Sequence, residues 1–268
     1  MDGGTTIGAA GPGERVEHIE FTTRDGLRLH GRRYRTPRPT GAMPLLCLAG
    51  LTRNGRDFHD IAVALSDPAS TGARDVLTLD SRGRGLSEYD PDWRNYSVPI
   101  EMLDVQDFMT AAGIGTAAIL GTSRGGLITV LLAAAQPGLV GPVILNDIGP
   151  VIETEGLLRI AGYVGHSPLP HSWDDAARIA RDINRKQFPA VTDAQWMEIA
   201  RQFYNDRNGR PAPGYDAKLA RALSVLDGPI PRLWPQFEAL KRVPMMVLRG
   251  ENSDLLSAAT VEEMRRRH

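Results

Sequence analysis

The segment that decides the fold reads Ala117-Ala-Ile-Leu-Gly-Thr-Ser-Arg-Gly-Gly-Leu-Ile-Thr-Val-Leu-Leu-Ala-Ala-Ala135. Its apolar run 117–120 predicts a strand buried on both faces, and residues 125–135, apolar nearly all round, predict a buried helix. The Gly-Thr-Ser-Arg-Gly sequence between them is G-x-S-x-G in a strand–turn–helix setting, which exposes a serine hydroxyl at a sharp turn. Ser123 is therefore the predicted nucleophile. The amide of Arg124 is a predicted oxyanion donor, because helix N-termini present free N–H groups. The alternative is a serine that only caps the helix.

Short apolar runs on both sides of this segment extend the pattern. They are separated by amphipathic stretches such as 57–65, and they lie at 45–48, 76–79, 143–145 and 245–248. This alternation predicts an α/β fold with a doubly wound, mostly parallel sheet. Two segments of β-rich composition, 16–22 and 27–34, flank an Asp-Gly turn signal and predict an antiparallel hairpin at the start of the fold.

The rhythm of the pattern divides the chain into four parts. Residues 1–14 are Gly-rich and aperiodic, which predicts a disordered leader. Residues 15–152 form the first part of the core, and 241–268 form a second part. Between them, 153–240 has helical patterns and no strand-like run, so we expect an inserted helical cap. Helices are expected to begin there at Ser172 and at Thr192, where Gln195 completes a capping box.

Composition narrows the class of ligand. With 31 basic and 32 acidic residues, the chain has no net field to attract nucleic acid or an anionic membrane, and no apolar run reaches the roughly 18 residues of a membrane span. We expect a small-molecule substrate, no nucleic-acid or membrane partner, and a cytoplasmic location. No histidine or cysteine pair has metal-site spacing, so neither a metal nor a cofactor is expected. The single cysteine, Cys47, reads as a core residue, and nothing in the sequence indicates an oligomeric state.

Two further motifs give the chain a resemblance to the α/β-hydrolase superfamily, in particular to its cofactor-independent esterase, lactonase and C–C hydrolase branches. They are Leu48-Ala-Gly-Leu-Thr-Arg-Asn54 and Asp80-Ser-Arg-Gly-Arg-Gly-Leu-Ser87. The resemblance covers nearly the whole chain. It implies that the amide of Leu51 is the second oxyanion donor and that Asp80 and Arg82 are structural. Many relatives have His-Gly where this chain has Ala-Gly before Leu51.

The same resemblance implies a catalytic acid. Arg249-Gly-Glu-Asn-Ser-Asp254 follows the last apolar run and is similar to the family's acid-bearing turn, so Asp254 is the expected acid. Asp254 could instead cap a helix that begins near Ser257. Asp147, after the run 143–145, is the alternative acid.

The expected histidine is missing. This fold uses the order Ser, Asp, His, and only His268, the final residue, lies beyond Asp254. We expect His268 to end a surface helix. The chain then lacks a last strand, the histidine loop and a closing helix, which should leave a sheet edge and face exposed. The remaining histidines read as surface or cap residues: His18, His30, His59, His166 and His171.

The leading functional hypothesis is hydrolysis of an ester or lactone of a small apolar molecule through an acyl-Ser123 intermediate. Two alternatives stay open: C–C bond hydrolysis of the meta-cleavage-product type, and a non-catalytic binding protein, suggested by the missing histidine. A serine at the elbow disfavours epoxide hydrolase and dehalogenase chemistry, which need a carboxylate there. Cap aromatics are expected mainly as cap core: Trp173, Trp196, Phe203, Tyr204 and Trp234.

Overall fold

The computed structural model of the chain describes residues 6–8, 16–37, 40–224 and 230–268. In these ranges the main sheet has the strand order β1-β2-β3-β5-β4-β6-β7-β10. Its strands are β1 (Thr6–Gly8), β2 (Val16–Thr22), β3 (Arg28–Tyr34), β4 (Leu45–Leu48), β5 (Val76–Asp80), β6 (Ala117–Thr122), β7 (Val140–Asn146) and β10 (Met245–Leu248).

Strand direction confirms the predicted sheet. Strands β5, β4, β6, β7 and β10 pair in parallel, whereas β1, β2 and β3 pair antiparallel and join the parallel part through β3 and β5. The continuous apolar runs form the central strands because both faces are covered: β4 and β5 are buried along their full length. The Asp-Gly signal also holds, since Gly26 turns the β2–β3 hairpin with a φ of 90°.

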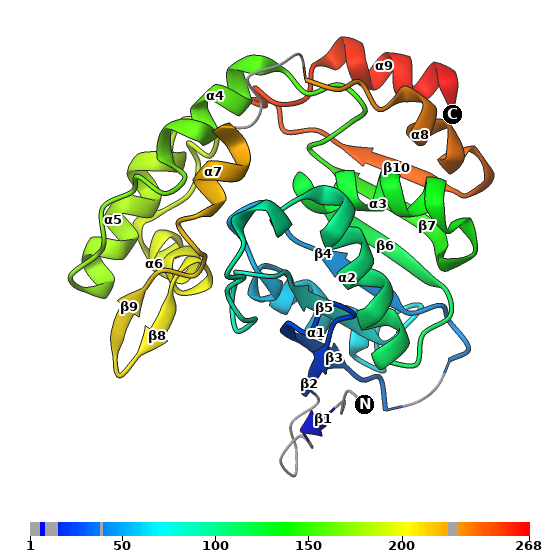
Figure 1. Cartoon of the computed structure of the whole chain (residues 1–268), viewed down its shortest axis with the longest axis horizontal. Coiled ribbons are helices and arrows are strands. Elements are labelled where there is room, and N and C mark those ends of the chain that lie inside the picture. The colour runs from blue at the N-terminus through cyan, green and yellow to red at the C-terminus, as the bar shows by residue number, and fades with distance from the viewer. Residues whose placement is uncertain (1–5, 9–15, 38–39, 225–229) are drawn as a thin grey trace.

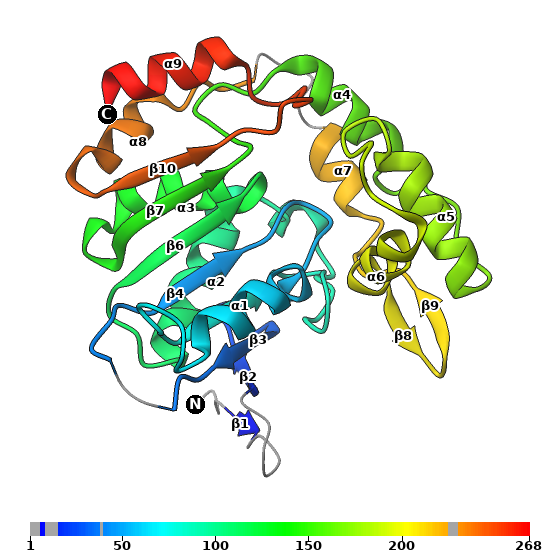
Figure 2. The same cartoon turned by 180° about the vertical axis from the view of Figure 1, so that it is seen from behind.

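Helices cover both faces of this sheet (Figures 1 and 2). Helices α2 (Val98–Ala111) and α3 (Arg124–Ala135) pack on one face, where α3 contacts β6, β7 and β4. Helix α1 (His59–Ser66) packs on the opposite face against β5 and β3. The main hydrophobic core lies between the sheet and the α2–α3 layer. Within the described ranges, no helix combines the length and apolar character that a membrane crossing requires.

Most of the expected cap stands apart from the sheet, on the side toward which the parallel strands point (Figure 1). It contains α4 (Thr154–Tyr163), α5 (Trp173–Asn184), α6 (Asp193–Phe203) and α7 (Leu219–Ser224). The predicted helix starts are present: the Ser172 hydroxyl accepts from the Asp175 amide, and Thr192 and Gln195 form a capping box.

Two features of the cap differ from the expectation. A short hairpin, β8 (Asn205–Arg207) and β9 (Arg210–Ala212), lies in a region predicted to have no strand. Its three-residue strands are too short to leave a periodic signal, but the turn residues Asn208 and Gly209 both have positive φ, as a two-residue hairpin turn requires. At the other end, α8 (Trp234–Phe237) and the 3-10 turn Glu238–Arg242 contact α3 of the core.

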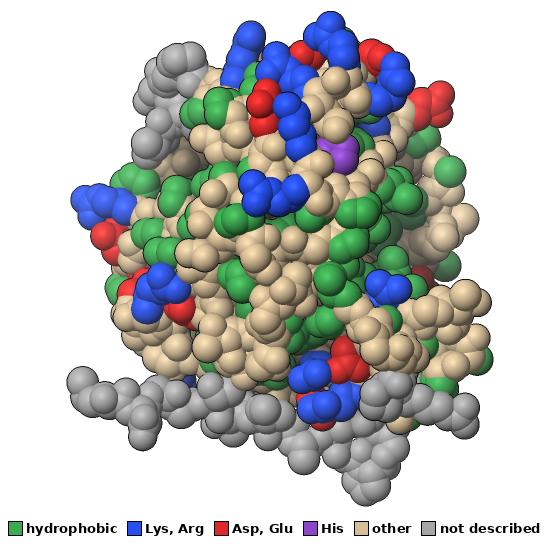
Figure 3. All heavy atoms as spheres, turned by 90° about the vertical axis from the view of Figure 1, so that its right-hand side faces the viewer, with side chains coloured by type: hydrophobic (Ala, Val, Ile, Leu, Met, Phe, Trp, Pro, Cys, Tyr) green, Lys and Arg blue, Asp and Glu red, His purple; other side chains and the backbone are tan. Residues whose placement is uncertain are grey.

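The two edge strands of the sheet, β1 and β10, can be compared with the sequence predictions. The predicted leader is wrong for Thr6–Gly8, which pairs with β2 as β1, while its other positions lie outside the described residues. Strand β10 ends the sheet at the opposite side and pairs with β7. Met246 and Leu248 share one face of β10 and are 54% and 44% exposed. Hydrophobic side chains are spread over this side of the molecule below the basic end formed by α9 (Ala258–Arg267) (Figure 3).

The prediction of a surface His30 is wrong, because this residue is only 4% exposed. Its Nδ1 lies 2.9 Å from Oδ2 of Asp80, and its Nε2 lies 2.8 Å from Nδ1 of His18. The buried Asp80 carboxylate also accepts from the amides of Gly55 and Leu86. Asp80 thus fixes three segments around the end of β5, in keeping with a structural role.

This carboxylate predicts an acid-labile fold. Burial alone would raise the pKa of Asp80, but the contact with His30 and the charge of Arg32 lower it from 3.8 to about 2. Because the folded-state pKa is depressed, the stabilisation is complete above about pH 4 and is lost as the pH falls towards 2. We expect this group to contribute about 2 kcal/mol to the free energy of unfolding at pH 5 and almost none at pH 2.

Urea denaturation between pH 5 and pH 2 measures this effect. An Asp80→Asn variant should lack that part of the pH dependence. If the variant shows the same pH dependence as the unchanged chain, the attribution to Asp80 is wrong.

Candidate active site

Ser123 occupies the sharp turn that the sequence predicts, between β6 and α3. Its φ of 50° and ψ of −115° place a non-glycine residue in a strained region of backbone space. The turn is held from both sides: the Ser123 amide donates to the carbonyl of Asn146, and the Ser123 carbonyl accepts from the amide of Gly126. Such strain is commonly kept where a side chain must be presented for function.

The two flanking glycines are needed for space, as the motif implies. A Cβ on Gly121 would lie 2.7 Å from the carbonyl oxygen of Gly125, and a Cβ on Gly125 would lie 2.2 Å from the carbonyl oxygen of Leu48. Both obstacles are backbone atoms, which cannot rotate away. The turn therefore brings α3 closer to β4 and β6 than any residue with a side chain would allow.

Two cavities meet at Ser123. The polar cavity, about 310 Å³, lies under the cap and is lined by Arg53, Arg159, Asn184 and Gln187, among others. The apolar cavity, about 670 Å³, extends between α2, α3 and α4. Both are also lined by the same four residues: Leu51, Ser123, Ile160 and Leu255.

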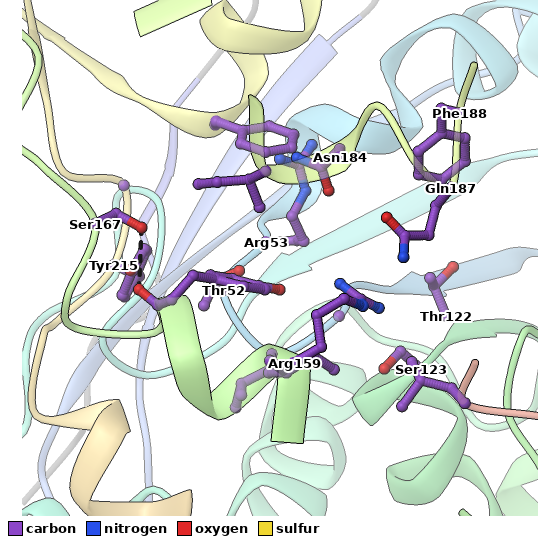
Figure 4. Close-up of a pocket in the computed structure, with 18 of the residues that line it drawn as sticks. Thr52, Arg53, Thr122, Ser123, Arg159, Ser167, Asn184, Gln187, Phe188 and Tyr215 are labelled. Atoms are coloured by element: carbon purple, nitrogen blue, oxygen red, sulfur yellow. Dashed lines mark hydrogen bonds between the residues drawn. The ribbon is translucent and has the colours of Figure 1, made fainter. Parts of the chain in front are cut away.

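The two candidate acids lie on the wall of the polar cavity with Ser123. Asp254 is bound by Arg159 of α4, whose Nε and Nη2 lie 2.5 Å and 2.9 Å from the two carboxylate oxygens. This hydrogen bonding lowers the pKa of Asp254 and raises that of Arg159. Figure 4 shows Arg159 and Ser123 directed into the same cavity.

Asp147, the alternative acid, has a different environment. It follows β7 with a φ of 55°, and its carboxylate accepts from the amide of Gly250 at 3.2 Å and from the Ser253 hydroxyl at 3.0 Å. It thus joins the loop after β7 to the loop after β10. The structure places Asp147 and Asp254 on one wall, and the choice of acid stays a prediction.

The residues of the two predicted oxyanion donors are linked through one buried carboxylate. Glu101 of α2 accepts from Arg124 Nε and from Arg84 Nη1, both at 2.6 Å, and Arg84 Nε donates to the carbonyl of Leu51 at 2.7 Å. Burial alone would raise the pKa of Glu101, but the charges of Arg124 and Arg84 outweigh it and lower the pKa. Arg124 is the first residue of α3, so its amide has no partner within the helix.

None of the described histidines lines either cavity. His268 ends α9, with its Nε2 3.1 Å from the carbonyl oxygens of Leu240 and Val243, as expected of a residue at a helix end. His59 contacts the Tyr34 hydroxyl on the far side of the sheet. The described ranges also hold no group of three or more His, Cys, Asp or Glu side chains suited to a metal ion.

Sequence reasoning missed three contributors to the site: Glu101, Arg84 and Arg159. Arg84 belongs to a motif that was recognised, and its complete burial was the missing information. Glu101 and Arg159 carry no motif, since their roles arise only when α2 and α4 are placed beside the elbow. Among the cap aromatics, Trp196 is buried as expected, but Phe203 and Tyr204 line the polar cavity.

Comparison with known proteins places this site in a family. A family model described as the alpha/beta hydrolase family matches residues 45–268. The 3-hydroxybutyrate-oligomer hydrolase of Cupriavidus necator is 32% identical over 238 residues, covering 84% of this chain and 78% of the relative. The 2-(acetamidomethylene)succinate hydrolase of Mesorhizobium japonicum is 28% identical over 236 residues, covering 85% of this chain and 78% of the relative.

A solved structure supports the same family assignment. The crystal structure of an alpha/beta hydrolase from Novosphingobium aromaticivorans is similar with a TM-score of 0.86 and 39% identity, covering 96% of this chain and 88% of that chain. The chain therefore belongs to the alpha/beta hydrolase family, and its general function is that of a hydrolase.

Proposed function

We propose that the protein is a serine hydrolase that cleaves an ester or lactone of a small apolar molecule. The observation that carries the proposal is the strained Ser123 at the point where a polar and an apolar cavity meet. The Cupriavidus relative supports ester chemistry, because an oligomer of a hydroxy acid is joined through ester bonds.

The proposed reaction has two steps. Oγ of Ser123 bonds to the ester carbonyl carbon while its proton passes to a base, and the alcohol leaves with a proton. Water then cleaves the acyl-Ser123 bond and releases the acid. The amides of Leu51 and Arg124 are the proposed donors to the negative oxygen of each tetrahedral intermediate. Asp254, or Asp147 in its place, is the proposed acid that orients the base.

For the base, we propose a histidine from polypeptide outside the 268 residues, placed beside the acid. Its approach requires Arg159 to share or release Asp254, or else the use of Asp147. Loss of the base in serine hydrolases costs several powers of ten in rate, with residual catalysis from the oxyanion donors. If the gene encodes such a histidine downstream, the longer chain should react with a serine-directed probe far faster than residues 1–268.

A fluorophosphonate probe tests the proposal. The folded chain is expected to form an adduct on the peptide that contains Ser123, faster than the urea-unfolded chain does, as identified by mass spectrometry. A folded chain that forms no adduct would favour the non-catalytic binding alternative. Assays with a p-nitrophenyl ester and with a meta-cleavage product then separate ester from C–C bond hydrolysis.

A further inference from the structure

The apolar cavity has a wall built from two helices at helical spacing. On α3, residues 124, 127 and 131 follow one another at intervals of three and four, so Leu127 and Leu131 present one stripe to the cavity. On α4, Leu157 and Ile160 form the facing stripe. Further hydrophobic side chains complete the lining: Ile148, Ile152, Leu223, Ile230 and Leu233.

Among the described residues, three larger polar side chains border this cavity, and each already has a partner. Arg94 is largely exposed and pairs with Asp92 at the surface. Arg124 donates to Glu101 and to the carbonyl of Tyr96. The Tyr96 hydroxyl donates to Asp216 at 2.6 Å and accepts from the amide of Asp90. A polar ligand in this cavity would lose its water and find few partners, which is costly, whereas a hydrocarbon would gain from leaving water.

The polar cavity differs in this respect. Nη1 of Arg53 and Oε1 of Gln187 are buried there and have no hydrogen-bond partner among the described residues. These two atoms are not accessible from the cavity, but Thr52 and Asn184 also line it and offer polar groups to a ligand. Arg53 and Asn184 lie at the end of the cavity away from Ser123 (Figure 4). Both cavities have a mostly apolar lining, but the polar cavity also carries charged and amide side chains such as Arg53, Arg159 and Asn184.

We propose that the substrate is an ester with a medium-length hydrocarbon chain, roughly six to ten carbon atoms, bound in the apolar cavity, and a polar remainder bound in the polar cavity. This inference rests on the proposed function and specifies its substrate class. The position of Ser123, shared by both cavities, puts the scissile carbonyl at the boundary. Leu131 and Leu157 then determine how long a chain is accepted.

Binding of n-alkanoates to the Ser123→Ala variant tests the chain site without requiring turnover. Calorimetry with butanoate, hexanoate, octanoate and decanoate should show affinity rising about two- to four-fold per methylene group. Adding Leu131→Trp, which fills the cavity, should weaken octanoate binding at least about ten-fold and leave butanoate binding nearly unchanged. Leu157→Trp is a second filling variant from the opposite wall, in case the first does not fold.

The matched control is Leu158→Trp. Leu158 is also on α4 but is 67% exposed and lines neither cavity, so the variant should bind octanoate like the parent. Affinity that does not depend on chain length, or filling variants that bind octanoate like the control, would overturn the inference. A failure to label Ser123 would instead count against hydrolysis and leave this binding result standing.

A kinetic experiment identifies the part of the ester that carries the chain. Ethyl alkanoates extend the acyl side, and alkyl acetates extend the alcohol side. A rise in kcat/KM with chain length in either series supports the inference and assigns the side. Flat kcat/KM values in both series, from a chain that hydrolyses them, contradict it.

Discussion

In a chain that includes the proposed histidine base, a Ser123→Ala variant is expected to lose ester hydrolysis by a factor of roughly 10³ to 10⁶ in kcat/KM, and in residues 1–268 the same substitution is expected to remove the fluorophosphonate adduct completely. The alanine cannot form the acyl intermediate, so only the oxyanion donors and substrate binding remain to act on attack by water. The fold should persist, because the turn is held by the backbone amide and carbonyl of Ser123, which alanine keeps. Rates with a p-nitrophenyl ester and intact-mass analysis measure the two losses.

Ser70→Ala provides the matched control, since Ser70 lies in the loop after α1, away from both cavities. Its activity and adduct should equal those of the unchanged chain. If Ser123→Ala keeps its rate or its adduct, Ser123 is not the nucleophile.

The Glu101→Gln variant should have the largest effect on stability. Glu101 is 1% exposed and holds two arginines, so its neutral replacement leaves their charges without a counter-charge in a buried site. Breaking one partner of such a buried network costs about 3–5 kcal/mol in the free energy of unfolding. Below the unfolding temperature, the adduct rate should also fall about ten-fold or more, because the segments bearing Leu51 and Arg124 lose their common anchor.

Urea denaturation and probe-labelling rates measure these two effects separately. Glu88→Gln is the control, because Glu88 pairs with Arg28 at the surface, where ion pairs contribute little. A Glu101→Gln chain that is destabilised but labels Ser123 at the normal rate would show that Glu101 supports the fold alone. A Glu101→Gln chain with unchanged stability and an unchanged labelling rate would contradict both expected effects.

The sequence predicts those elements whose signals are local. The run at 45–48 appears as β4 with the predicted bounds, and the elbow at Ser123 is visible because close packing requires both of its glycines. The cap helices begin at Ser172 and Thr192, where side-chain oxygens satisfy free amides.

Features that depend on contacts distant in sequence were not predictable. His30 shares one face of β3 with Arg28 and Arg32, so it reads as exposed, and its burial follows only from pairing with β5 and Asp80. Glu101 and Arg159 sit on helices as ordinary charged residues. Glu101 precedes Arg124 by 23 residues, and Arg159 precedes Asp254 by 95 residues. Each gains its role only when the fold brings the two segments together.

Helix α4 lines both cavities, and this limits how the selectivity for each half of a substrate can change. Arg159 and Tyr163 lie toward the polar side, Leu157 lies toward the apolar side, and Ile160 borders both. A substitution that shifts or rotates α4 would therefore alter the preference for both halves of a substrate at once. Positions on a single wall, such as Leu131 and Arg53, would let one preference diverge while the other is retained, which makes them the natural targets for directed evolution.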